Sequence, residues 1–368
     1  RFEVGRYLHP YRGYEEYMLD LEERCDQSAG LECLRMSEID VLPKKTKQNY
    51  IVGISGGSVA NGIVNHKNSW LKSLNDRAYL ADKTIEVVDL TGRGYKQPQQ
   101  LTSLAYLLAL GLELDLLINL DGFNEMGVSK FEYDKSKMHP SYPQAWLPMT
   151  DSAISKSMLD FELQRRALDH SLLKLVSVCR SLSLSAIVQF WCDTRGPKLM
   201  REKALLRPME VEEQRQSTVE AVIAQRSRRG PALEELSDEE FFEMAALLWA
   251  NSSVQMAKLA KANGIRYVHF LQPNQYVPNS ISLTPEQKNL VITDSGYGPN
   301  FQEGHEYLLK QESFLLSSGV EFIDLSDIFV DARGDIYGDN CCHLTLTGQG
   351  ILVKSIFDAV FSEPQSIQ

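Results

Sequence analysis

The sequence predicts an α/β protein, a three-layer αβα sandwich in which helices cover both faces of a five-stranded parallel sheet. In the first third of the 368-residue chain, three short apolar segments alternate with segments of helical pattern. Strands that alternate with helices over short loops favour a parallel sheet, because each crossover helix packs back onto that sheet. Two further apolar segments towards the other end of the chain supply the remaining strands.

The five strands are expected at 50–54, 84–90, 114–120, 265–271 and 320–325, and branched residues are frequent in them. Each of the first three is followed by a glycine-containing turn. The carboxyl ends of parallel strands meet at one edge of the sheet, which is where ligands bind in such folds. The turns therefore predict a functional site at that edge.

Helices are expected at 59–74, with Trp70 on the buried face, and at 98–112 and 347–361. A further helix is expected to run to Ala262, because Ser237-Asp238-Glu239-Glu240 has the pattern of a capping box. These helices supply the outer layers of the sandwich.

The strand pattern stops between the third and fourth strands. Residues 126–263 have mostly helical sequence, and we expect a mainly helical insertion between two parts of the core, 50–125 and 264–368. Residues 1–49 contain an aromatic segment broken by proline and glycine, which we expect to pack on the core as an extension in a loop conformation.

Composition excludes some classes of protein. A net charge of −11 argues against a nucleic-acid binder, which needs a basic face. No apolar run reaches the roughly 18 residues of a membrane span.

Cysteine usage indicates the compartment. Cys25 and Cys33 flank a polar loop and are placed to close a small disulfide. This favours a secreted or periplasmic protein whose export signal is absent from the chain. No cysteine or histidine spacing is that of a zinc site, so no metal is expected.

The first glycine-rich turn, Ser55-Gly56-Gly57-Ser58, connects a strand to the start of a helix. Glycine allows close approach of a substrate to the backbone, and the N–H groups of the helix start favour negative charge. Ser58 in this position suits a nucleophile whose oxyanion meets backbone donors; the alternative is a serine that only caps the helix.

A competing interpretation makes Ser55 the nucleophile. Gly53-Ile54-Ser55-Gly56-Gly57 fits the G-x-S-x-G turn of α/β-hydrolases. That turn normally follows several strands, whereas this one ends the first strand, and Ser55 lies where the strand should continue. Ser58 is therefore favoured.

Four blocks follow one another in a characteristic order: Gly57-Ser58 with Gly62, then Gly94, then Gly122-Phe123-Asn124-Glu125, then His343-Leu344-Thr345 with Gly348. This order resembles the SGNH hydrolases, also called GDSL-type esterases and lipases, over roughly 50–125 and 264–360. Two positions depart from the usual pattern. Gly57 replaces Asp, as in Gly-Gly-Ser versions familiar in bacterial members, and Glu125 replaces Asp.

The resemblance implies a flavodoxin-like fold and a serine hydrolase mechanism without cofactor or metal. Ser58 would be the nucleophile and His343 the general base. The N–H groups of Ser58 and Gly94 and the side-chain amide of Asn124 would form the oxyanion hole.

The acid that orients the base is a third departure, because Asn340 stands three residues before His343, where the family has Asp. Asp339 is one residue further away. We favour Asp339, because a carboxylate stabilises an imidazolium and an amide does not. A Ser-His dyad assisted by a backbone carbonyl remains the alternative.

Other polar residues are candidates for secondary roles. Gln272 and Asn274 follow the fourth strand and are predicted to contact a hydroxylated substrate, and His139 is a candidate pocket residue. His269 is expected to be a packed core histidine. Cys341 and Cys342, next to the base, are expected to be two packed thiols rather than a vicinal disulfide.

The sequence thus predicts a carboxylic ester hydrolase acting on a small-molecule ester, with O-acetyl or short-chain acyl esters of a carbohydrate as candidates. Two other functions stay open. The same acyl-enzyme could pass its acyl group to a carbohydrate, which makes the protein an O-acyltransferase. The departures at Gly57 and Asn340 would also suit a catalytically silent binding or scaffold protein.

Overall fold

The computed structural model describes residues 3–19, 42–75, 83–146, 149, 156–181, 186–216 and 235–361. The chain divides into two compact units. The main unit comprises Arg1–Gln144 and Leu233–Gln368, and the helical unit comprises Ala145–Ala232. Every residue predicted to belong to the site falls within the main unit.

The centre of the main unit is a parallel sheet of five strands in the order β4-β3-β5-β6-β7. These strands are β3 (Asn49–Gly56), β4 (Thr84–Thr91), β5 (Leu116–Asp121), β6 (Arg266–Leu271) and β7 (Glu321–Asp324). Numbered within the sheet, the order is 2-1-3-4-5, which is the flavodoxin-like arrangement. The predicted fold class is confirmed.

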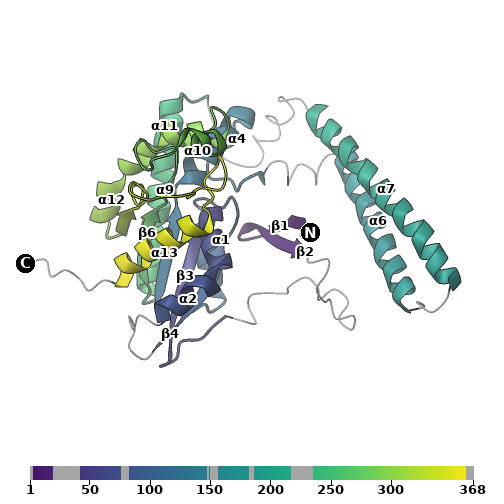
Figure 1. The fold of residues 1–368 in the computed structure, drawn as a ribbon, viewed down its shortest axis with the longest axis horizontal. Helices are drawn as coiled ribbons and strands as arrows, with labels where there is room; N and C mark the ends of the chain where they lie inside the picture. The colour runs from purple at the N-terminus through teal and green to yellow at the C-terminus, as the bar shows by residue number, and fades with distance from the viewer. Residues whose placement is uncertain are drawn as a thin grey trace, which may run out of the picture. The chain divides into compact units, whose positions relative to one another are not determined.

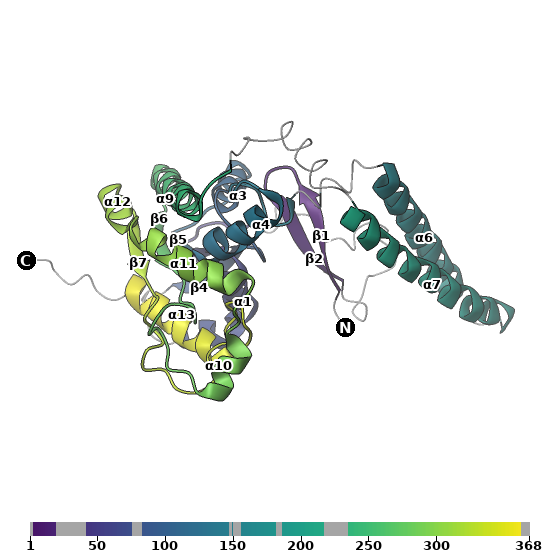
Figure 2. The same ribbon diagram turned by 90° about the horizontal axis from the view of Figure 1, so that it is seen from above.

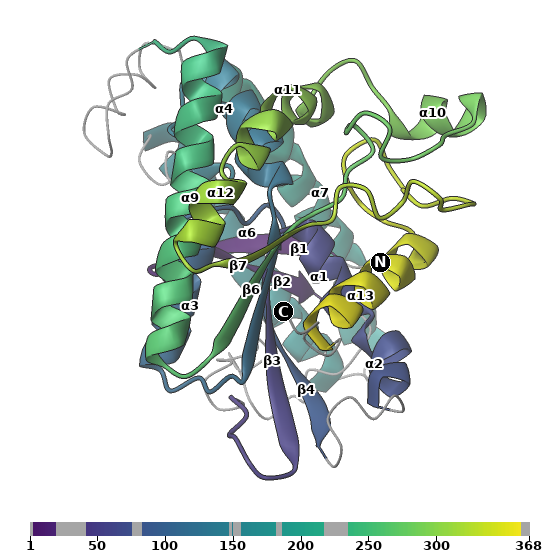
Figure 3. The ribbon, with the colours of Figure 1, turned by 90° about the vertical axis from the view of Figure 1, so that its left-hand side faces the viewer.

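Helices cover both faces of this sheet (Figures 1, 2 and 3). Helices α1 (Ser58–Asn65) and α13 (Leu346–Phe361) lie on one face, and α3 (Gln99–Ala109) and α9 (Asp238–Ala262) on the other. Every residue of β5 is buried, as expected for a central strand covered on both sides. The remaining elements of this unit are α2 (Lys67–Asn75), η3 (Asn124–Val128), α4 (Ser129–Ser136), α10 (Pro285–Val291), α11 (Tyr297–Leu309) and α12 (Glu312–Ser317).

Two local predictions were wrong. The aromatic segment near the N-terminus forms an antiparallel hairpin, β1 (Glu3–His9) and β2 (Gly13–Leu19), rather than a loop. Gly13 has a φ of 80°, which glycine adopts without strain and which lets the chain reverse. The single helix predicted at 59–74 is two helices, α1 and α2, although Trp70 is buried as expected. Residues 129–136 form α4, within the segment that is predicted to be mainly helical.

Helix α9 begins at the predicted capping box and packs on the sheet. The Ser237 side chain accepts a hydrogen bond from the Glu240 N–H, and the Glu240 side chain accepts one from the Ser237 N–H. Further along the helix, the Trp249 indole N–H donates to the buried Asp121 carboxylate at the end of β5, at 2.6 Å. Helix α9 belongs to the main unit, so the helical unit is shorter than the predicted insertion 126–263.

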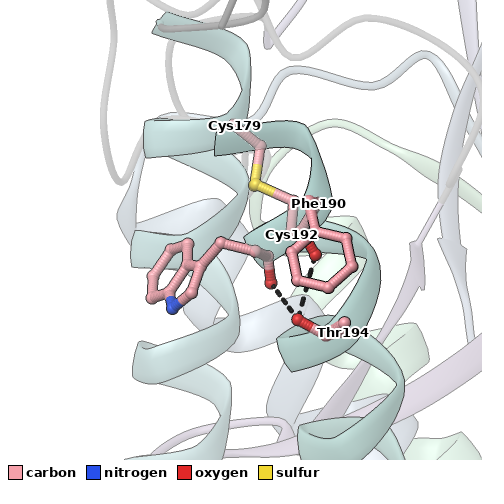
Figure 4. Close-up of a disulfide and its surroundings, with 5 residues drawn as sticks. Cys179, Phe190, Cys192 and Thr194 are labelled. Atoms are coloured by element: carbon pink, nitrogen blue, oxygen red, sulfur yellow. Dashed lines mark hydrogen bonds between the residues drawn. A yellow bond between two sulfur atoms is a disulfide. The ribbon is translucent and has the colours of Figure 1, made fainter. Parts of the chain in front are cut away.

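The helical unit contains two long helices, α6 (Lys156–Ser181) and α7 (Ala186–Gln216). A disulfide between Cys179 and Cys192 joins them (Figure 4). Local spacing did not predict this pair, because the two cysteines meet only when the chain folds back on itself. The predicted Cys25–Cys33 pair lies outside the described residues. None of the helices in the described ranges is long and apolar enough to cross a membrane.

The contact between α9 and Asp121 gives a first prediction. We expect Trp249→Phe to lower the free energy of unfolding by about 1.5–3 kcal/mol, because a buried carboxylate loses a hydrogen-bond donor. The matched control is Trp70→Phe, whose indole N–H donates to the neutral Ile63 carbonyl at 3.0 Å, and there we expect about 0.5–1.5 kcal/mol. Urea denaturation measures both; equal losses would contradict this account of α9.

Candidate active site

The turn between β3 and α1 presents Ser58 as the first residue of a helix. The N-cap residue is Gly57, which has no side chain to cap the helix. Ser58 therefore does not occupy the capping position. Gly56 has a φ of 144°, and a Cβ added there would collide with the Leu120 carbonyl of the adjacent strand. The turn is therefore possible only with glycine at 56, and it places Ser58 at a helix start where N–H groups lack intrahelical partners.

Ser55 has a different environment. It lies inside β3, where it is 1% exposed and pairs in register with Leu90 and Asn119. A nucleophile must reach its substrate, so the G-x-S-x-G interpretation does not fit this strand.

Asn124 lies beside the turn that carries Ser58. Its side-chain amide donates one hydrogen bond to the Tyr95 carbonyl at 2.8 Å, and a Cβ on Gly57 would collide with its Nδ2. An amide nitrogen has two hydrogens, so one donor direction is not used by Tyr95. The close approach also explains why glycine stands at 57, where an aspartate would displace the Asn124 amide.

Gly94 lies in the turn after β4, and the N-terminal hairpin holds that turn. Gly94 has a φ of 76°. The hydroxyl of the fully buried Tyr14 donates to the Arg93 carbonyl at 2.6 Å, and the Tyr95 hydroxyl donates to the Tyr14 carbonyl at 2.7 Å. The hairpin thus fixes the backbone on both sides of Gly94.

Asp339, and not Asn340, contacts the predicted base. The ring nitrogen Nδ1 of His343 is hydrogen-bonded to Oδ2 of Asp339. The other carboxylate oxygen accepts the N–H groups of Cys341, Cys342 and His343 at 3.0, 3.2 and 3.2 Å. These bonds fold residues 339–343 into a tight turn, which returns the ring to a carboxylate four residues earlier. Asn340 is exposed.

The two groups shift each other's ionisation. Burial alone would raise the pKa of Asp339, but hydrogen bonds from the His343 side chain and from the backbone lower it to about 2. The Asp339 hydrogen bond raises the pKa of His343, against opposing effects of burial and of Arg93. The carboxylate therefore stays ionised near neutral pH and stabilises a protonated imidazole.

A cleft of about 350 Å³ brings Ser58 and His343 to one surface. Most of its lining residues are polar, although apolar atoms make up the larger share of its exposed surface. The other lining residues are Val59, Asn61, Gly62, Asn65, His66, Arg93, Leu344 and Gln349. A larger cavity, of about 640 Å³, lies beside α11 and contains none of the predicted site residues. The smaller cleft is consequently the candidate active site.

The predicted substrate contacts after β6 have another function in the structure. The Asn274 amide donates to the Cys341 carbonyl at 3.3 Å, the Gln275 amide to the Asp339 carbonyl at 3.0 Å, and the Tyr276 hydroxyl to the Asn340 carbonyl at 2.8 Å. Gln272 and Asn274 are buried and neither lines the cleft. Residues 274–276 therefore hold the 339–343 turn in place, a role that spacing along the sequence did not reveal.

His139 does not line the cleft either. Its Nδ1 is hydrogen-bonded to the Ser141 hydroxyl at 2.7 Å within its own loop, and burial lowers its pKa. These contacts indicate that His139 packs within its own loop and does not serve the pocket.

A second Ser-His-Asp arrangement is buried between the sheet and helix α9. His269 contacts the Asp121 carboxylate through Nε2 at 2.8 Å and the Ser253 hydroxyl through Nδ1 at 2.7 Å. Both ends are inaccessible, because Ser253 and His269 are fully buried and Asp121 is 2% exposed. The prediction that His269 is a core histidine is confirmed, and hydrogen-bond geometry alone does not make a catalytic triad.

Glu125 is the residue of the third block that departs from the family pattern, and it supports the turn after β5. Its carboxyl oxygens accept the N–H groups of Gln97 and Gly122, each at 2.9 Å. Burial, with the nearby charge of Asp121, raises the pKa of Glu125 to about 8. Glu125 therefore has a structural role beneath Asn124.

No family model and no curated protein matches the chain. Among solved structures it is similar to a GDSL-like lipase from Bacteroides thetaiotaomicron, with 12% sequence identity and a TM-score of 0.38 over 88% of this chain and 93% of that chain. Chains this dissimilar need not share a family. We therefore infer the chemistry from the residues of this chain.

Glu125 gives a prediction about pH. An ordinary glutamate titrates near 4.5, so between that pH and about 8 the folded chain holds a proton that the unfolded chain has lost. The stability from this proton is complete below about pH 4.5 and is lost as the pH rises towards 8. We expect Glu125→Gln to remove up to about 1.4 kcal/mol per pH unit of this decline, although the variant is less stable by about 1–3 kcal/mol because one backbone N–H loses its acceptor.

Urea denaturation at a series of pH values measures that slope. The matched control is Glu239→Gln, at an exposed position in the first turn of α9, which should leave the slope unchanged. A slope in Glu125→Gln equal to that of the wild type would contradict a protonated Glu125.

Proposed function

We propose that this chain is a serine hydrolase that cleaves carboxylic esters through an acyl-enzyme. The observation that supports this function best is the contact between the Asp339 carboxylate and His343 Nδ1, in the cleft that Ser58 also lines. A serine, a histidine and an ionised carboxylate are the three groups that this kind of nucleophilic catalysis requires.

In the first step, the Ser58 oxygen attacks the ester carbonyl carbon and His343 accepts the hydroxyl proton. Because Nδ1 is held by Asp339, Nε2 is the nitrogen that acts as base. Asp339 stabilises the resulting imidazolium. The N–H groups of Ser58 and Gly94 and the Asn124 amide would bind the developing oxyanion. Of these three residues only Ser58 lines the cleft, so the other two donors would act from behind its wall.

The tetrahedral intermediate then collapses. The C–O bond to the alcohol breaks, the alcohol leaves with the proton from His343, and the acyl group stays on Ser58. In the second half, His343 takes a proton from water, whose oxygen attacks the acyl carbon. Collapse of this second intermediate releases the carboxylic acid and returns the proton to Ser58.

The cleft wall supports a short acyl group on a hydroxylated alcohol, such as an O-acetylated carbohydrate. Asn61, Asn65 and Arg93 supply polar groups, and the lining contains few apolar side chains. Gln349 also lines the cleft, and its Oε1 is buried without a hydrogen-bond partner among the described residues. Because this oxygen has almost no exposed surface, a substrate hydroxyl would reach it only if the Gln349 side chain turned towards the cleft.

A kinetic comparison tests the proposed function. We expect hydrolysis of p-nitrophenyl esters to fall with increasing acyl length, acetylated sugars to be accepted, and Ser58→Ala to be inactive. We expect Asp339→Asn to lower kcat by about 10³–10⁴-fold, since the imidazolium loses its counter-charge. It should also move the acid limb of the kcat profile to lower pH, because Asp339 raises the pKa of His343.

Asn340→Ala is the matched control, at the neighbouring exposed position, and should retain kcat close to the wild-type value. Loss of activity in Asn340→Ala with retention in Asp339→Asn would overturn this assignment. Equal activity in Ser58→Ala and wild type would overturn the mechanism as a whole.

A further inference from the structure

Two thiols lie next to the base and have no role in the proposed chemistry. The sulfur atoms of Cys341 and Cys342 are 3.5 Å apart and both cysteines are free. One ring nitrogen of His343 and both sulfurs lie within 4.8 Å of one another. Cys342 is 1% exposed and Cys341 is partly exposed, so the cluster reaches from the protein interior to the surface of the loop.

We propose that Cys341, Cys342 and His343 form a binding site for one soft divalent cation, Zn²⁺ or Cd²⁺. Two thiolates and an imidazole are a ligand set that such cations prefer. Tetrahedral coordination with bonds of about 2.3 Å to sulfur and about 2.0–2.1 Å to nitrogen places ligand atoms roughly 3.5–3.8 Å apart. The separation of 3.5 Å between the sulfurs matches this requirement.

The ligands are preorganised by the 339–343 turn. Asp339 accepts all three of their N–H groups, and Asn274 donates to the carbonyl of Cys341. Asp339 also binds Nδ1 of His343, so the nitrogen that we propose for the cation is Nε2. A carboxylate on the second ring nitrogen is the usual outer partner of a metal-binding histidine, because it fixes the ring orientation and raises its basicity.

Sequence spacing did not indicate this site, since zinc patterns are built from separated pairs of ligands and here the three residues are consecutive. Consecutive side chains normally diverge. In this turn the backbone curls around Asp339, and the three donor atoms converge.

Binding would release the two thiol protons to solvent and occupy the nitrogen lone pair that accepts the proton of Ser58. The cation would therefore inhibit the enzyme reversibly by removing its base. This consequence rests on the proposed function, whereas binding itself depends only on the cluster.

The test uses the full chain with Cys25→Ser and Cys33→Ser, because those cysteines lie outside the described residues. The protein is kept under argon without reductant, so that the Cys179–Cys192 disulfide stays intact. Cd²⁺ is titrated while ultraviolet sulfur-to-cadmium charge-transfer absorption and calorimetric heat are recorded. We expect one ion per chain, with circular dichroism unchanged.

Cys341→Ser, at the partly exposed position, should lose most of the charge-transfer absorption. It should also weaken binding by more than the roughly 10–100-fold that is typical when an outer partner of a metal ligand is removed. Ser58→Ala should keep the charge-transfer absorption, because Ser58 contacts Cys342 but is not itself a ligand. Ester hydrolysis by the parent should be lost on loading and restored by a chelator. If the protein has no esterase activity, the proposed function fails and the absorption still decides the site.

Three results would overturn the site. These are no charge-transfer absorption in the parent, equal binding by Cys341→Ser, and a Cys341–Cys342 disulfide found by mass spectrometry of the parent after alkylation.

Discussion

The carboxylate of Asp339 accepts hydrogen bonds from three consecutive backbone N–H groups and contacts the ring of His343 at the same time. One oxygen fixes the backbone of the turn, and the other fixes the side chain that the turn presents. The backbone of the turn therefore fixes the orientation of the ring, because the imidazole cannot rotate away without losing its contact with Asp339. The buried residues 274–276 bind the carbonyls of the same turn from beneath. The position of the candidate base thus depends on Asp339.

The sheet supplies the opposite side of the cleft. Parallel pairing of β3 with β4 and β5 brings the turns after these strands together, and with them Ser58, Gly94 and Asn124. Close packing determines which residues those turns accept. A side chain at Gly56 would collide with the backbone of β5, and one at Gly57 with the Asn124 amide. The glycine that departs from the usual pattern at 57 is thereby explained by the position of the neighbouring amide, and it does not by itself indicate lost activity.

Much of this arrangement was predictable from the sequence, since strand ends are marked by local pattern and parallel strands place their ends at one edge. The five strands lie within about two residues of their expected positions, and the preference for Ser58 over Ser55 followed from where the first strand ends. Side-chain direction was not predictable. Asn274 follows a strand end as Asn124 does, yet it turns inward to hold a loop more than sixty residues later in the chain. The Cys179–Cys192 bond and the 3–19 hairpin likewise depend on chain reversals that local spacing does not encode.

The central claim is that Ser58 is an activated nucleophile, and covalent labelling tests it most directly. The folded chain is treated with a fluorophosphonate, and the modified peptide is located by mass spectrometry, with Ser58→Ala and His343→Ala in parallel. We expect one label per chain on Ser58, no label in Ser58→Ala and greatly slowed labelling in His343→Ala. Absence of labelling in folded wild-type protein would contradict catalysis and favour a binding protein. Labelling at a serine other than Ser58 would contradict the assignment of the nucleophile.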